Sequence, residues 1–204
     1  MKQQVFYIHG GNAYTRYEDL LADLRTATIY DLPWDKPVVR WTNTLREDLG
    51  DSYEVFKPTM PNSKNSKYQE WRIWFERHFE YLHDDIILVG WSQGGMFLTK
   101  YLLEETLPFS VKALFLIAAP FKADDFGGED GGDFIFDVTR VGELAEKVGK
   151  ISIFHSKDDF VVPYEHALKY KEVLPEAEFV SFEDKNHFLV AELPELIERI
   201  KDIG

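Results

Sequence analysis

Six short apolar runs, separated by longer stretches with helical periodicity, set the strongest limit on how this chain folds. The runs cover Val5–Ile8, Tyr53–Phe56, Ile86–Val89, Ala113–Ile117, Ile151–Phe154 and Phe179–Phe182. Most are continuously apolar, which is typical of parallel strands that are covered on both faces. Strands that alternate with helices predict an α/β chain with a doubly wound, mostly parallel sheet of about six or seven strands between two helical layers.

The helical stretches between these runs have recognisable ends. Gly50 ends a helix whose apolar face includes Val38 and Leu49, and Ser66 and Gln69 have the spacing of a capping box at the start of the next helix. Further helices are predicted at residues 96–105, 141–148, 164–174 and 194–203. With 204 residues and no internal repeat, the chain is expected to form one domain over residues 1–204.

Composition excludes several classes of function. The chain has no cysteine, so disulfides, thiolate metal sites and a cysteine nucleophile are ruled out. A net charge of −13 disfavours nucleic acid and anionic membranes as partners. The amino-terminal apolar run is too short for a signal peptide, and the longest run, Ala113–Ala119, is far below the roughly 18 residues of a membrane span. We therefore expect a soluble, cytoplasmic protein. The acidic segment 122–133 is not expected to bind calcium, because it lacks the residue spacing of a calcium-binding loop.

The clearest catalytic pattern in the sequence is Gly90-Trp91-Ser92-Gln93-Gly94, a G-x-S-x-G motif. The predicted strand Ile86–Val89 leads into it and a predicted helix follows it, which is the context of a nucleophile elbow. Such a turn strains the serine backbone, and glycines on either side avoid a collision with it. Ser92 is the candidate nucleophile, and the amide of Gln93 lies at the positive end of the following helix, where it would bind an oxyanion.

A serine nucleophile needs a base, and His187 has the best position for that role. It follows the last predicted strand, as the base of a serine hydrolase with this elbow does. His78, His83 and His166 lie in or beside helices, and His155 ends a strand.

The motifs together resemble those of the α/β-hydrolases. His9-Gly10-Gly11 follows the first strand, as the H-G-G pattern does in lipases and esterases. In its small size the chain is similar to the serine hydrolases typified by the retinoblastoma-binding serine hydrolase and its bacterial relatives. This resemblance implies a Ser-Asp-His triad and neither a cofactor nor a metal.

The resemblance also suggests the remaining site residues. An acid followed four positions later by proline matches Asp159 and Pro163, although Asp158 competes, and Asp124 and Asp125 occupy a less common position. The second oxyanion donor is expected to be the amide of Gly11, with Asn12 as the alternative.

Two departures from the family pattern are visible. Asn186 stands where a glycine usually precedes the base, and the region 26–50 is longer than expected, which suggests a small cap-like insertion. The predicted function is a carboxylesterase that acts on small ester substrates through Ser92, Asp159 and His187. The alternative is a catalytically weak or inactive hydrolase-fold protein that binds a ligand or a protein partner.

Overall fold

Parallel strands at the predicted apolar runs form the centre of the molecule. The computed structural model describes residues 2–29, 32–36, 38–122 and 130–204, and these form a six-stranded sheet of order β2-β1-β3-β4-β5-β6. All five strand pairs are parallel. The strands are β1 (Gln3–Ile8), β2 (Tyr53–Phe56), β3 (Ile86–Trp91), β4 (Val111–Ile117), β5 (Val148–Ser156) and β6 (Glu178–Phe182). The predicted doubly wound parallel sheet is confirmed.

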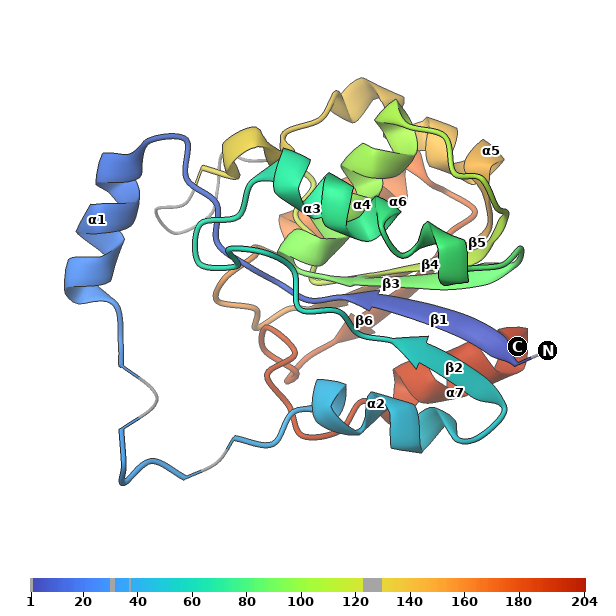
Figure 1. Ribbon diagram of the computed structural model, residues 1–204, viewed down its shortest axis with the longest axis horizontal. Coiled ribbons are helices and arrows are strands. Elements are labelled where there is room, and N and C mark those ends of the chain that lie inside the picture. Colours follow the sequence, from blue (N-terminus) through green and yellow to red (C-terminus); the bar gives the residue numbers. More distant parts are fainter. Residues whose placement is uncertain (1, 30–31, 37, 123–129) are drawn as a thin grey trace.

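Helices cover both faces of this sheet (Figure 1). One face carries α3 (Tyr68–Glu76), α4 (Gln93–Glu104), α5 (Leu144–Lys147) and α6 (Glu165–Val173), and the other carries α2 (Trp41–Leu49) and α7 (Pro194–Ile203). Side chains of β1 alternate between the two cores: Phe6 and Ile8 join the first, and Val5 and Tyr7 join the second. Short 3₁₀ segments lie at Phe79–Tyr81, Gly132–Phe134 and Val138–Glu143.

An aromatic cluster fills the core beneath α3 and α4. Phe75 is fully buried, and its ring meets Phe6, Phe79, Phe97 and Tyr101 edge to face at centroid distances of 5.0–5.6 Å. This geometry is preferred by aromatic pairs because the positive ring edge meets a negative ring face. The cluster therefore anchors α3 and α4 to each other and to β1.

The order of the strands reverses beside β1, because β2 lies on one side of it and β3 on the other. Open α/β sheets bind ligands at such a switch point, outside the carboxyl ends of the strands. Ile8 pairs with Gly90, so the segments that leave β1 and β3 begin side by side. The two motifs that carry the predicted chemistry thus meet at one edge of the sheet.

One helix was not predicted, and two local predictions were wrong. Tyr17–Thr26 forms a helix, α1, whose residues Tyr17, Leu20, Leu21 and Leu24 have helical spacing, although only Leu20 is buried. The helix predicted at 141–148 is a 3₁₀ segment followed by α5, and Val148 instead begins β5, where it pairs with Val111 of β4. Ser66 does not cap α3; its hydroxyl bonds the Ser63 carbonyl at 3.4 Å.

A residue far along the chain caps α3 instead. The carboxylate of Asp133 accepts the Tyr68 amide at 3.0 Å. A side-chain oxygen can satisfy a free amide at the start of a helix wherever it comes from in the sequence. No local sequence pattern could reveal this cap.

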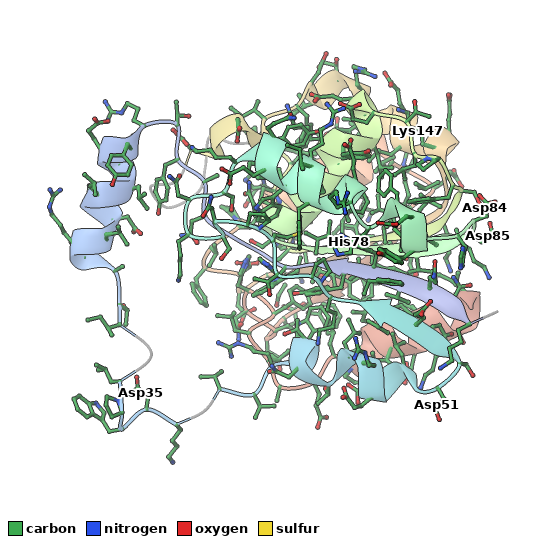
Figure 2. All side chains as sticks on the ribbon, in the orientation of Figure 1. Asp35, Asp51, His78, Asp84, Asp85 and Lys147 are labelled. Carbon is green, nitrogen blue, oxygen red and sulfur yellow. The ribbon has the colours of Figure 1, made fainter. Side chains whose placement is uncertain are left out.

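The region 26–50 has two parts. Its second part is α2, which packs with α7 on the sheet through Trp41, Leu45 and Leu49. The described residues of its first part, with α1 before them, lie beyond the carboxyl ends of the strands. Figure 2 shows Asp35 there, far from Asp84 and Asp85 at the start of β3. Residues 30, 31 and 37 lie outside the described part of the chain. Among the described residues, no helix is long and apolar enough to cross a membrane.

The role of the aromatic cluster can be tested on α3. We expect Phe75→Ala to destabilise the protein by about 3–5 kcal/mol, the usual cost of removing a buried phenyl ring. Ile73→Ala on the same helix is the matched control, because Ile73 is 53% exposed and should change stability by less than about 1 kcal/mol. Urea unfolding of both variants measures the difference, and equal losses would contradict the assignment.

Candidate active site

Ser92 occupies a strained turn between β3 and α4. Its φ is 54° and its ψ is −124°, a conformation that residues other than glycine rarely adopt. Its amide donates to the Ile117 carbonyl at 2.8 Å, and its own carbonyl accepts the Gly95 amide at 2.9 Å. Backbone hydrogen bonds therefore hold both ends of the turn and keep Ser92 in its strained conformation.

The neighbouring glycines are required by close backbone packing. A Cβ at Gly90 would lie 2.6 Å from the Gly95 Cα, and one at Gly94 would lie 2.7 Å from the His9 carbonyl oxygen. Both separations are well inside van der Waals contact. The turn can hold Ser92 in this position only while both residues lack side chains.

Asp159 and His187 come together from the loops after β5 and β6. The Nδ1 of His187 lies 2.9 Å from Oδ2 and 3.1 Å from Oδ1 of Asp159. The Asp159 side chain is fully buried, and its Oδ1 also accepts the amides of Val161 and Val162 at 2.8 and 2.9 Å. Because a carboxylate only accepts, Nδ1 of His187 carries the proton, and Nε2 is left free to take one.

Asp158 points to a different set of partners. Its Oδ1 accepts the Ser156 hydroxyl at 2.5 Å and the Asn186 amide at 2.8 Å. The bond from Ser156 holds the pKa of this carboxyl below its usual range. Asp158 therefore ties the loop after β5 to the loop that carries His187, and it does not touch the imidazole. The alternative acids Asp124 and Asp125 lie outside the described residues.

Asn186 adopts the left-handed conformation that glycine would otherwise supply. Its φ is 45°, and its side-chain oxygen accepts the Leu189 amide at 2.9 Å. Asparagine tolerates this region better than most residues because its short polar side chain bonds locally. The departure from the family pattern at this position thus preserves the turn.

Two tryptophans hold the same loop, which sequence reasoning did not reveal. The indole N–H of Trp91 donates to the His187 carbonyl, and that of Trp41 donates to the Phe188 carbonyl, both at 3.1 Å. Trp91 lies within the G-x-S-x-G motif, so the residue was visible but its partner was not. The elbow thereby fixes the position of the histidine loop directly.

Ser92 and His187 line one cleft of about 480 Å³, together with Gly10, Gly11, Asn12, Trp91, Gln93 and Phe160. Among the described residues, no hydrogen bond joins the Ser92 hydroxyl to the His187 ring. In sites without substrate, such bonds are often long and tighten only in the complex. Trp91 and Phe160, which flank the motif residues in sequence, line the cleft, whereas Phe121 and Phe188 are buried in the core.

The His9 side chain orients the peptide between Gly10 and Gly11. Its Nε2 accepts the Met60 amide at 2.8 Å, so its Nδ1 carries the proton that is donated to the Gly10 carbonyl at 2.5 Å. In a trans peptide the carbonyl and the next N–H point in opposite directions. The Gly11 N–H therefore points away from the His9 ring.

Three backbone amides along the cleft are candidates for an oxyanion donor, those of Gly11, Asn12 and Gln93. Gln93 is the first residue of α4, where a helical N–H lacks an acceptor within the helix. The Asn12 amide, by contrast, donates to the Ser63 carbonyl at 2.9 Å, which removes it from the candidates for an oxyanion donor. Gln93 and Gly11 remain. No group of three or more His, Asp or Glu side chains in the described ranges is arranged to hold a metal.

The fold and its neighbours define the class of the protein. No protein-family model and no curated protein matches the sequence. Solved structures do match: the ydeN gene product of B. subtilis is 18% identical, with a TM-score of 0.75, over 99% of this chain and 98% of that chain. The Paleococcus ferrophilus monoacylglycerol lipase is 14% identical (TM-score 0.57, 98% and 95% covered), and the esterase domain of a Rhodothermus marinus protein is 16% identical (TM-score 0.59, 99% and 88% covered). The chain has the α/β-hydrolase fold.

The turn before His187 can be tested through Asn186. We expect Asn186→Ala to destabilise the protein by about 1–2 kcal/mol, because alanine in the left-handed region is strained and loses the bond to Leu189. Asn186→Gly is the control, since glycine adopts the same φ without strain and should cost less. Denaturant unfolding measures both variants. A larger loss for glycine than for alanine would contradict the conformational argument.

Proposed function

We propose that this protein is a serine hydrolase that cleaves small carboxylic esters. The observation that carries the proposal is the contact of Asp159 with Nδ1 of His187. His187 and Ser92 line the same cleft. A carboxylate, an imidazole and a strained serine are the parts that activate a hydroxyl for nucleophilic attack. Neighbours in the same fold that are named esterase and lipase agree with this class of reaction.

In the proposed reaction, Oγ of Ser92 attacks the ester carbonyl while Nε2 of His187 takes its proton. Asp159 holds the ring in the required tautomer and stabilises the imidazolium that forms. The amides of Gln93 and Gly11 bind the developing oxyanion, and one such donor is worth about 10²–10³ in rate. The alcohol leaves with the proton from His187, and a water molecule then releases the acid from Ser92 by the same steps.

The preference for small esters is based on the cleft. Its volume is about 480 Å³, and Trp91, Phe160, Val161 and Val162 give it apolar walls. A short acyl chain would bury most of its surface there.

One observation favours the alternative of a weak or inactive binding protein. The Ser92 hydroxyl is not bonded to the His187 ring among the described residues. If that separation persisted with substrate bound, the serine would lack its base. A reagent that reacts only with an activated serine separates the two functions.

A fluorophosphonate probe supplies this test. We expect wild-type protein to be labelled, and Ser92→Ala to lose both labelling and hydrolysis of p-nitrophenyl acetate, because only an activated hydroxyl attacks phosphorus. Ser52→Ala is the matched control, since Ser52 is exposed at the opposite edge of the sheet. Wild-type protein that remains unlabelled while correctly folded would support the binding protein instead.

The two adjacent aspartates provide a second test. Asp159→Asn is expected to lower kcat by about 10⁴-fold, because an amide next to Nδ1 favours the wrong imidazole tautomer. Asp158→Asn should cost far less, since its carboxylate bonds Ser156 and the Asn186 amide and not the ring. Assays at saturating substrate, with circular dichroism as a check of folding, compare the variants. If Asp158→Asn were the more damaged, the assignment of the acid would be wrong.

A further inference from the structure

A second histidine lies beside the Asp159 carboxylate. His155 is the penultimate residue of β5 and is 1% exposed. Its Nε2 lies 2.8 Å from the Val162 carbonyl oxygen and 3.6 Å from Oδ2 of Asp159. The mechanism proposed above does not use this residue, and yet it is packed against the acid.

The protonation state of His155 follows from these partners. A carbonyl oxygen only accepts, so Nε2 carries the hydrogen. Burial lowers the pKa of the ring, and the charged groups that face it are Asp159, His187 and Glu165, with the Tyr164 ring packed edge-on. His155 is therefore neutral at pH 7, and it donates its Nε2–H to the Val162 carbonyl while the ring lies beside the carboxylate.

Asp159 and His155 each bond one end of Val162. Its amide donates to Oδ1 of Asp159, and its carbonyl accepts from His155. The loop that carries the acid is thus fixed at its beginning by β5 and at Val162 by the histidine. Without the second bond, the carboxylate could turn with its loop and leave Nδ1 of His187.

We propose that His155 is a positioning residue that holds the Asp159 carboxylate against His187. It does so by clamping the Val162 carbonyl, because the amide of the same residue donates to Oδ1 of the acid and Oδ2 lies 3.6 Å from the imidazole Nε2. The inference rests on the proposed function only for its kinetic consequence, because the clamp itself is a matter of hydrogen bonds. A histidine that merely filled the core would need no donor at this position.

Two substitutions at His155 separate the hydrogen-bond donor from the shape of the ring. Glutamine places its Nε2 near the position of the imidazole Nε2 and keeps the donor, whereas His155→Phe keeps a ring and removes the donor. We expect His155→Phe to lower kcat about tenfold with KM within about twofold of wild type. It should also move the acidic limb of the kcat/KM profile to lower pH, because a loosened carboxylate stabilises the protonated base less. His155→Gln should restore both, and His83→Gln, at an exposed histidine, is the matched control.

Nitrogen-15 spectra of the ring nitrogens supply a readout that does not depend on ester hydrolysis. In wild-type protein at pH 7 we expect His155 to be the neutral Nε2–H tautomer and His187 to carry its proton on Nδ1. In His155→Phe the His187 ring should lose its single tautomer. If the protein proves inactive toward esters, only the kinetic arm is lost, and the spectra still decide the proposal.

Three results would overturn it. One is a charged His155, or its Nδ1–H tautomer, in the wild-type spectra, which need no variant to fold. Another is a folded His155→Phe with unchanged kcat, pH profile and His187 tautomer. The third is a His155→Gln that behaves like the phenylalanine variant, because the donor would then be irrelevant.

Discussion

Close parallel pairing of β1 with β3 is the constraint on which the rest of the site depends. Pairing of Ile8 with Gly90 brings His9-Gly10-Gly11 beside the Ser92 turn, and a Cβ at Gly10 would lie 3.2 Å from the Ser92 Cβ. The start of α4 approaches the end of β1 so closely that a side chain at Gly94 would meet the His9 carbonyl oxygen. Ser92 and the Gly10-Gly11 segment thus share one small region, because two adjacent strands end there.

Connections between neighbouring loops make the other half of the site rigid. The loop after β5 and the loop after β6 are joined by the Lys157 amide to the Phe182 carbonyl at 2.8 Å, and by Asp158 to the Asn186 amide. The indole of Trp91 extends this connection to the elbow. Because each loop is held by its neighbour, His187 and Asp159 keep their relative position without a local sequence signal for it.

Much of the fold was predictable because its signals are local. Strand β2 has the predicted bounds, and so does α7, which begins at Pro194, a residue suited to the first turn of a helix. The errors have non-local causes: α3 is capped by Asp133, and Val148 joins a strand because Val111 lies beside it. The omission of α1 had no such cause: Tyr17, Leu20, Leu21 and Leu24 have the spacing of a helical stripe, although only Leu20 is buried in the fold.

The sequence by itself determined the order of the six strands and of most helices along the chain, and the glycines that permit the Ser92 turn. It also identified Ser92, His187 and the aspartate pair as candidates. These follow from periodicity and backbone sterics, which act over a few residues. Only the tertiary structure decided which aspartate faces the imidazole, that the Asn12 amide is already bonded to Ser63, and that Trp91 holds the His187 loop. Each of these depends on the direction of a single hydrogen bond between segments far apart in the chain. Such directions are set by packing of the whole sheet, and spacing along the sequence does not contain them.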